Sequence, residues 1–279
     1  VFRGGLNYEI SNGWNLRSSF GQGFRFPTMT ELYFKGDIGP INLYNNPDLI
    51  PESGWTSELG LKKVIKIRNF KGYVDLVGFL MEYNDMMEFT FGQWGDPLTM
   101  PFYGLGFKSL NTGPTKITGL DLSVVGQMRV LKGNVRVFGG YTSSLPVAEN
   151  TGYVFANDSV GNALTYTSTS SDATNGVLKY RSLRTFKMDV SYRIKRINVG
   201  ISWRYQSQVQ NIDKAFVDPL FAFFVPGVQT GLNLNPKGYW VTDLRMSYRL
   251  SYRLKLSVIV NNYGNVEYME RPADIGAPR

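Results

Sequence analysis

The sequence contains no cysteine and no histidine among its 279 residues. These absences exclude a disulfide framework, a zinc site built on those ligands, a histidine-ligated haem and a Ser-His-Asp triad from this chain alone. An unbroken run of about 18 apolar residues, as a membrane-spanning helix needs, is also missing. Hydropathy does not reveal a membrane β-barrel, however, because the inward-facing residues of its strands are polar.

Glycine and aromatic residues are plentiful instead. The chain has 30 Gly, 18 Phe and 17 Tyr, a mixture that favours strands and turns over helices. Its formal net charge of +8 points to anionic partners. The cations are spread along the predicted strands rather than gathered in one block, so we expect no nucleic-acid partner. We also expect no enzyme activity, no cofactor and no metal site.

Alternation with a period of two residues recurs from end to end. In residues 183–195, LRTFKMDVSYRIK, one face carries Phe186, Met188 and Val190, while charged and small residues occupy the other face. The pattern predicts an all-β fold of about ten antiparallel strands. We place these strands at residues 1–10, 14–25, 54–67, 72–91, 107–129, 133–146, 182–195, 197–212, 238–250 and 252–262.

Short turns and long loops alternate between the predicted strands. Turns such as Asn12-Gly13 are followed by long segments at 26–53, 93–106, 147–180, 213–237 and 262–279, which hold most of the Pro, Asn, Asp and Thr residues. The segment 147–180 is rich in Ser, Thr and Asn, and we expect it to be mobile. No long helix is predicted, although PTMTELYF at 27–34 can form a helical turn. Short turns at one end and long loops at the other are typical of an outer-membrane barrel.

A soluble β protein is the alternative reading, and it requires a second layer packed on the apolar face. Residues near the strand ends fit the aromatic girdles of a membrane barrel, although each alone also fits an ordinary core. These residues are Trp14, Trp55, Tyr73, Trp203, Tyr205, Trp240 and Tyr263. Strand edges cannot stay open in lipid, so we expect ten strands either to close as a small barrel or to be part of a larger one.

Two stretches carry a resemblance to a known family. The first, SSFGQGFRFPTMTELYF at 18–34, matches a strand that ends in Gly-x-Gly-Phe-Arg-x-Pro. The second, NNPDLIPESGWTSELGLKK at 45–63, matches a loop with Asn-Pro-x-Leu-x-Pro-Glu before a strand with Glu-Leu-Gly. Residues 74–89, 117–123 and 260–279 match later segments in family order. The chain therefore resembles the C-terminal half of the barrel of a TonB-dependent outer-membrane receptor, of the Bacteroidetes type.

The resemblance implies a barrel of about 22 strands that encloses an N-terminal plug domain. Residues 1–279 would then be the C-terminal portion of that barrel, with the plug domain and the last strand outside this chain. The long loops would be extracellular and the short turns periplasmic. The charged motif residues Arg25, Glu31, Glu52 and Glu58 are interpreted as ion pairs of the barrel wall.

The implied function is active import of a scarce solute, such as a ferric siderophore, that is energised by TonB. The implied partners are the plug domain, the TonB complex, and the lipid and lipopolysaccharide of the bacterial outer membrane. One alternative is an oligosaccharide or peptide importer of the SusC type, with a SusD-like surface lipoprotein as partner. Another is a receptor-like barrel that serves as a structural subunit of a larger outer-membrane complex.

Two groups of site residues follow from these expectations. Exposed aromatic residues in long loops often form binding surfaces, although they also pack loops against each other. The predicted ligand-binding residues are Tyr33, Phe34, Tyr44, Trp94, Phe102, Tyr103, Phe221, Phe223 and Phe224. Inward-facing cations expected near the short turns are predicted to face the plug domain: Lys187, Arg193, Arg245, Arg249 and Arg253.

Overall fold

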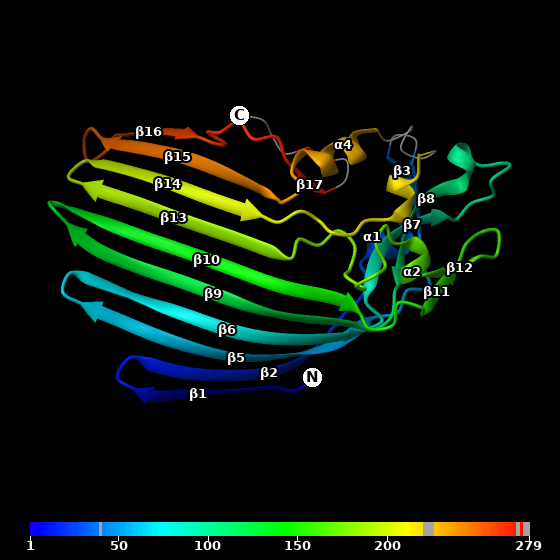
Figure 1. The fold of residues 1–279 in the computed structure, drawn as a ribbon, viewed down its shortest axis with the longest axis horizontal. Helices are drawn as coiled ribbons and strands as arrows, with labels where there is room; N and C mark the ends of the chain where they lie inside the picture. The colour runs from blue at the N-terminus through cyan, green and yellow to red at the C-terminus, as the bar shows by residue number, and fades with distance from the viewer. Residues whose placement is uncertain (39–40, 220–225, 272–273, 276–279) are drawn as a thin grey trace.

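One antiparallel sheet of ten strands dominates the computed structural model, which describes residues 1–38, 41–219, 226–271 and 274–275. Each strand of this sheet pairs with its neighbours in chain order, which confirms the predicted all-β class and the succession of hairpins (Figure 1). The strands are β1 (Arg3–Ser11), β2 (Trp14–Arg25), β5 (Glu52–Ile67), β6 (Phe70–Asn84), β9 (Thr115–Val130), β10 (Gly133–Ala148), β13 (Arg184–Ile194), β14 (Ile197–Gln206), β15 (Tyr239–Arg249) and β16 (Lys255–Val260).

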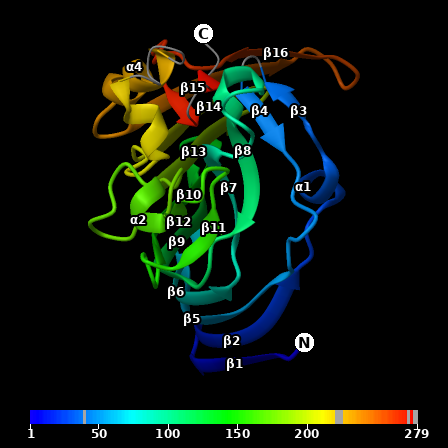
Figure 2. The same cartoon turned by 90° about the vertical axis from the view of Figure 1, so that its right-hand side faces the viewer.

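The sheet is curved and its two ends differ in architecture. Seen end-on, the strands follow an open arc from β1 to β16 (Figure 2). Short turns close the hairpins at one end, and the smaller strands and helices gather at the other end (Figure 1). We call these the turn end and the loop end. This asymmetry confirms the layout of turns and loops that the sequence predicts.

The outer face of the sheet is apolar along its whole width. The register places Val190 opposite Val137 and Ile201, and it places Ile201 opposite Leu244. Many side chains of this face are more than half exposed, because no other described element packs on it. Examples are Leu59 (58%), Leu120 (54%), Met246 (51%), Leu256 (55%) and Val258 (64%). The apolar face therefore meets no second protein layer, which leaves hydrocarbon as its natural solvent.

Two predicted strands are each divided in the structure. The stretch 72–91 ends as β6 at Asn84, and β7 (Met87–Gln93) leaves the large sheet. The stretch 107–129 contains β8 (Leu105–Asn111) and β9. The breaks lie at Asp85, with φ of 53°, and at Gly113, with φ of 94°, so the chain adopts a left-handed conformation that no strand accepts. Alternation alone does not show such breaks.

Two further predicted strands are shorter in the structure than predicted. The strand predicted at 252–262 begins only at Lys255, because the hydroxyl of Ser251 accepts hydrogen bonds from the backbone N–H groups of Arg253 and Leu254 and holds a turn there. The strand predicted at 197–212 ends at Gln206.

The loop end consists of four excursions from the large sheet, which we call the loop assembly: residues 26–51, 85–114, 149–183 and 207–238. The first excursion holds α1 (Met29–Tyr33), which confirms the predicted helical turn, and β3 (Gly36–Ile38) and β4 (Ile41–Tyr44). The second holds β7, η1 (Pro101–Gly104) and β8. The third holds β11 (Val154–Asn157), β12 (Ala163–Thr165) and α2 (Tyr166–Thr169), and the fourth holds η2 (Lys214–Val217) and α4 (Pro226–Leu234), a helix that the sequence reading missed.

A second sheet ties the first two excursions together. Its strand order is β3-β4-β8-β7, in which β4 and β8 run parallel. The chain leaves β16 for the short hairpin of β17 (Met269–Arg271) and β18 (Asp274–Ile275). No helix of the described residues is both long and apolar enough to cross a membrane.

Aromatic residues mark both ends of the outer face. Near the loop end, Phe20 stacks on Trp55 with ring centroids 5.8 Å apart, and Tyr205 lies 5.0 Å from Trp240. At the turn end, Trp14 lies beside the first turn. Tyr73 differs from the prediction, because it shares the inner face with Lys62, whose Nζ lies 4.0 Å from its ring. Trp14, Trp55, Tyr205 and Trp240 lie at the ends of the outer face, where the predicted girdles require them.

Candidate functional site

The inner face of the arc carries the charged side chains, and two of its ion pairs cross an intervening strand. Arg17 of β2 reaches Asp75 of β6 at 2.7 Å, and Arg245 of β15 reaches Asp189 of β13 at 2.5 Å. The strand between them presents a glycine in each case. A Cβ on Gly200 would stand 2.6 Å from Nε of Arg245, so this position must lack a side chain for the arginine to pass.

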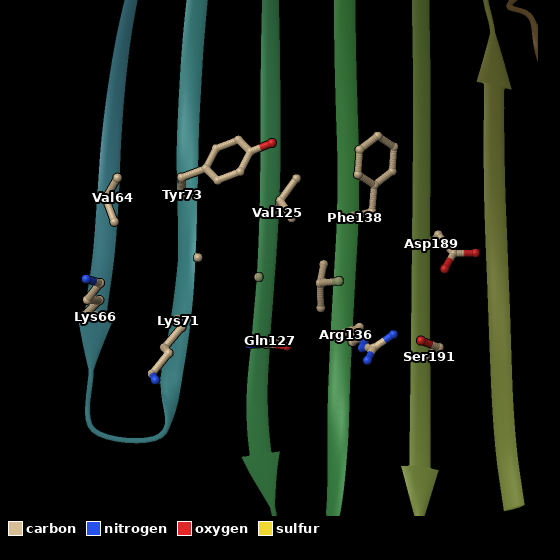
Figure 3. A pocket seen from close by; sticks show the side chains of 13 residues that line it. Val64, Lys66, Lys71, Tyr73, Val125, Gln127, Arg136, Phe138, Asp189 and Ser191 are labelled. Atoms are coloured by element: carbon tan, nitrogen blue, oxygen red, sulfur yellow. The ribbon is translucent and has the colours of Figure 1, made fainter. Parts of the chain in front are cut away.

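The turn-end half of the inner face is cationic. A hollow of about 590 Å³ is lined there by Lys66, Lys71 and Arg136, with Gln127 between the last two (Figure 3). Lys66 lies directly opposite Lys71 in the register, a pairing of like charges that is unfavourable without a counter-anion. No ion pair within the described part of the chain neutralises these three cations.

The same excess of cations continues around the last hairpins. Arg249 lies directly opposite Lys255, and a smaller hollow there is lined by both of them and by Arg193 and Lys195. The sequence predicts cations that are spread along the strands rather than gathered in one block, with several inward cations near the short turns. In the fold the turn end concentrates cations, while half of the 22 Asp and Glu residues of the sequence, among them Glu31, Asp96 and Asp158, fall in the loop excursions.

The five predicted plug-facing cations take different positions. Arg193 and Arg249 lie on the inner face at the turn end, as expected. Arg245 is also inward, but Asp189 already pairs with it. Lys187 lies nearer the loop end of β13, and Arg253 lies in the final turn, with its guanidinium carbon 4.9 Å from the ring of Tyr252. The expectation that all five lie near the short turns is therefore wrong for Lys187, whereas Arg253 does lie at the turn end.

An apolar cluster joins all four excursions of the loop assembly. Its buried members are Phe91, Ile212, Phe216 and Val228. Around them pack Ile41 from the first excursion, Phe102, Leu105 and Phe107 from the second, Tyr180 from the third and Leu232 from the fourth. The loops therefore bury one common core, as a small domain does.

A buried ion pair lies beside this cluster, between the third and fourth excursions. Asp213 accepts a hydrogen bond from Lys179 Nζ at 2.5 Å, and the two side chains are only 1% and 3% exposed. The hydroxyl of Tyr180 also donates to Asp213, and Thr169 accepts a second bond from Lys179 at 3.4 Å. A buried pair of this kind is costly to break from one side, because the remaining charge then has no counter-ion.

Backbone bonds reinforce this junction. Ser171 and Tyr180 of the third excursion donate backbone N–H bonds to the carbonyls of Ile212 and Asn211 in the fourth. The side chain of Asn211 donates to the Val177 carbonyl at 2.7 Å. Part of the segment 147–180 predicted to be mobile, including Tyr166, Thr169 and residues 177–180, is thus packed into the loop assembly.

Glu88 of β7 extends the buried charge to the second excursion. Its Oε1 lies 3.7 Å from Arg181 Nη2, and its side chain is 8% exposed. Burial raises the pKa of Glu88, and the nearby Asp213 adds to this, although Lys179 and Arg181 act in the opposite direction. The sequence reading missed all of these residues, because a charge within a polar loop gives no signal of burial.

Four residues stabilise the entry to the first excursion. Arg25 at the end of β2 pairs with Glu52 of β5 at 2.9 Å and with Glu31 of α1 at 3.0 Å. Glu31 and Thr28 form a capping box at the start of α1. These contacts confirm the structural interpretation of Arg25, Glu31 and Glu52 that the motif suggested.

Several predicted ligand-binding aromatics pack within the loop assembly instead. Phe102 contacts the apolar cluster, and Tyr44 donates a hydrogen bond to the Gly104 carbonyl at 3.1 Å. Trp94 lies under Lys108, whose Nζ is 5.4 Å from its ring, and its buried Nε1 has no hydrogen-bond partner in the described chain. The alternative reading, that aromatics pack loops together, fits these three residues.

The other predicted aromatics are exposed at the surface or lie outside the described residues. Tyr33, Phe34 and Tyr103 are 58%, 51% and 65% exposed. Phe221, Phe223 and Phe224 lie outside the described residues. Among the described residues, no group of three or more carboxylates could hold a metal ion.

Comparison with known proteins is consistent with this architecture. The family described as "TonB dependent receptor-like, beta-barrel" matches residues 1–263. The hemoglobin and hemoglobin-haptoglobin-binding protein A of Haemophilus influenzae is 25% identical over 158 residues, which are 55% of this chain and 14% of that protein.

Two solved structures with a similar fold are much longer than this chain. The ferric-catecholate import receptor Fiu of Escherichia coli K12 matches with a TM-score of 0.62 and 20% identity, over 99% of this chain and 33% of that one. The hemophore receptor HasR of Serratia marcescens, solved with its hemophore HasA and heme, matches with a TM-score of 0.59 and 16% identity, over 99% and 37% of the two chains. The chain thus spans about a third of the length of these structures.

Proposed function

The chain belongs to the family of TonB-dependent receptor-like β-barrels, and we propose that it forms wall and outer loops of an importer that TonB energises. Its family and its structural neighbours make it an integral outer-membrane β-barrel segment rather than an enzyme. In the proposed orientation the loop assembly is extracellular and captures the solute, while the short turns face the periplasm. Residues 1–279 are the C-terminal portion of the barrel in this proposal, of the Bacteroidetes type that the motifs resemble.

The sheet with two unlike faces carries the proposal. Its outer face is apolar and uncovered, and its inner face holds ion pairs and unpaired cations. Such a sheet is stable where lipid meets one side and a polar lumen meets the other. A water-soluble protein with more than half of Leu59, Leu120 and Val258 exposed would present an aggregation surface.

The cationic half of the lumen supports a plug domain as partner. Lys66, Lys71, Arg136, Arg193 and Arg249 line one continuous inner surface that has more cations than acids. An acidic surface of a plug domain would relieve the repulsion within the opposed pairs. We therefore keep Arg193, Arg249 and Arg245 as plug-facing residues and add the three cations of the hollow.

A ferric siderophore or a related iron carrier is the proposed solute. Structural neighbours named for ferric-catecholate and siderophore import support this choice, and others are named for hemophore and copper. Tyr33, Phe34 and Tyr103 are the proposed contacts, because exposed aromatic side chains suit the flat rings of such ligands. Should the solute be haem, its iron ligand would not be a histidine of this segment.

Uptake by the full-length receptor in its own outer membrane tests this function. A strain without the receptor is expected to lose growth under iron limitation and uptake of radiolabelled ferric siderophores, and a strain without TonB is expected to lose the same uptake. The triple variant Y33A/F34A/Y103A is expected to weaken uptake at least tenfold. Leu98→Ala is the matched control, because Leu98 is 92% exposed in the same loop assembly but is not aromatic.

Other outcomes separate the alternatives. A growth defect on defined glycans, with normal iron uptake, would favour the SusC-type importer with a surface lipoprotein. Normal growth in both media, together with recovery of the receptor in a larger complex, would favour a structural subunit. Either result contradicts siderophore import without affecting the barrel assignment.

A further inference from the structure

Cations are a shared feature of the short turns. Four of the five turns between the paired strands carry Arg or Lys, and none of the five carries Asp or Glu. The cations are Arg68 between β5 and β6, Lys132 between β9 and β10, Lys195 and Arg196 between β13 and β14, and Arg253 between β15 and β16. All five side chains are exposed. We call these five residues the basic rim.

The apolar outer face continues down to this basic rim. Ile67 is the last residue of β5 and is 65% exposed, and Ile197 is the first residue of β14. The turns themselves expose Leu131 by 90% and Tyr252 by 84%. An outer surface that is apolar up to its last residue remains in hydrocarbon up to that point, so the turns lie at the level of the lipid headgroups.

The first turn shows the same combination in another form. Trp14 and Lys63 lie opposite each other on the outer face, with Lys63 Nζ 4.7 Å from the indole ring. The same Nζ donates to the Asn12 carbonyl in the turn at 3.4 Å. The apolar stem of Lys63 thus lies along the outer surface while its charge extends toward the turn, as lysines do at a membrane interface.

The backbone conformation of the turns gives independent support for a contact made by the long side chains of turn residues. Arg68, Leu131 and Lys195 have φ of 47°, 52° and 50°, in the left-handed region that favours glycine or asparagine. Each of these turns would therefore form more easily with glycine. The presence of long cationic and aliphatic side chains at these strained positions indicates that the side chains themselves make a contact that offsets the strain.

We propose that the basic rim binds the headgroups of anionic phospholipids in the leaflet that adjoins the short turns. The exposed Leu131 and Tyr252 insert among the acyl chains and glycerol groups, and the cations beside them pair with lipid phosphates. A lipid surface fits better than an acidic protein, because the cations occur in four successive turns from β5 to β16 and the exposed Leu131 and Tyr252 lie beside two of them. The inference rests on the proposed function only for the membrane location, and it requires no transport.

Competition between lipids tests the proposal on the full-length receptor. The purified receptor is incorporated into nanodiscs of phosphatidylglycerol and phosphatidylethanolamine, and the lipids retained after transfer to neutral detergent are counted by native mass spectrometry. The test variant replaces with glutamine three rim cations that line neither inner hollow: R68Q/K132Q/R253Q. The control removes the same charge from exposed loop-end lysines: K35Q/K214Q/K237Q. Arg196 is left intact, because it donates a hydrogen bond to the Leu250 carbonyl that holds the turn.

The wild type and the control are expected to retain phosphatidylglycerol in preference to phosphatidylethanolamine. The rim variant is expected to lose this preference by about fivefold for each cation removed. Equal melting temperatures of the three proteins in neutral detergent show that the variants fold. Equal retention by the rim variant and the wild type would overturn the proposal, and so would displacement of the lipid by millimolar inorganic phosphate. A rim variant that keeps its lipids but exposes the plug domain to protease would assign the rim to an acidic protein surface instead.

Discussion

Replacing Asp213 with asparagine is expected to unlock the loop assembly without unfolding the barrel. The substitution keeps the size of the side chain but leaves the ammonium group of Lys179 buried at 3% exposure with only Thr169 and a neutral amide as partners. Removing one partner of a buried ion pair costs about 3–5 kcal/mol. Because both partners here are almost fully buried, no discount for solvent screening applies.

Hydrogen exchange of the full-length receptor measures this effect. A loss of about 3 kcal/mol corresponds to a roughly hundredfold rise in the open population of the loops. Amides of residues 177–182 and 211–216 are therefore expected to exchange about a hundredfold faster in Asp213→Asn, while β9 and β10 keep their protection. The second variant, K179M/D213N, removes both charges and is expected to recover most of the protection.

Two results would refute this reasoning. Unchanged exchange at residues 177–182 in Asp213→Asn would show that the ion pair does not hold the loops. An equal increase in β9 and β10 would show that the loop assembly and the barrel unfold as one unit. Failure of K179M/D213N to recover would locate the effect in the hydrogen bond of Tyr180 rather than in the charge pair.

Three further predictions concern single positions. Burial raises the pKa of Glu88, so its contribution to loop stability is fully present below the ordinary pKa of a glutamate and is lost as pH rises through the raised pKa. Glu88→Gln should therefore abolish this pH dependence, as measured by amide hydrogen-exchange rates corrected for the intrinsic effect of pH on exchange. Gly200→Ala should displace Arg245 from Asp189 and lower the free energy of unfolding in urea by about 1 kcal/mol. Gly78→Ala is the control and should lower it less, because a Cβ there meets only an ordinary contact at 3.6 Å. Equal losses would contradict the idea that Arg245 crosses the strand over Gly200. Tyr103→Gly should stabilise its turn by about 1 kcal/mol, because Tyr103 has φ of 55° and glycine adopts this conformation without strain. The same variant should weaken solute binding. A lower melting temperature would contradict the predicted stabilisation.

The sequence predicts the large sheet well, because its physical cause is periodic. Apolar residues at every second position must share one face, so the pattern predicts that Val190, Ile201 and Leu244 lie on the apolar side of their strands, as they do. The short turns are equally local, since two residues such as Leu131 and Lys132 suffice to close a hairpin. The motif around Arg25 and Glu52 also led to the correct ion pairs.

The loop assembly could not be predicted in the same way, because its contacts join residues far apart in the chain. Nothing in the neighbourhood of Asp213 shows that Lys179, 34 positions earlier, lies against it. Aromatic residues posed the same difficulty, since Phe102 and Tyr103 are adjacent and yet one is packed in the cluster and the other is exposed. The break at Asp85 was missed because a single left-handed residue does not disturb the alternation on either side of it.

The buried Lys179–Asp213 pair also has a consequence for the exchange of parts between related receptors. A chimaera that receives the third excursion alone would bury the ammonium group of Lys179 without its carboxylate partner. A chimaera that receives the fourth excursion alone would bury the carboxylate of Asp213 without its ammonium partner. These two segments are therefore expected to be inherited together, and recombination that separates them is expected to yield receptors whose barrel inserts correctly but whose loop assembly does not fold.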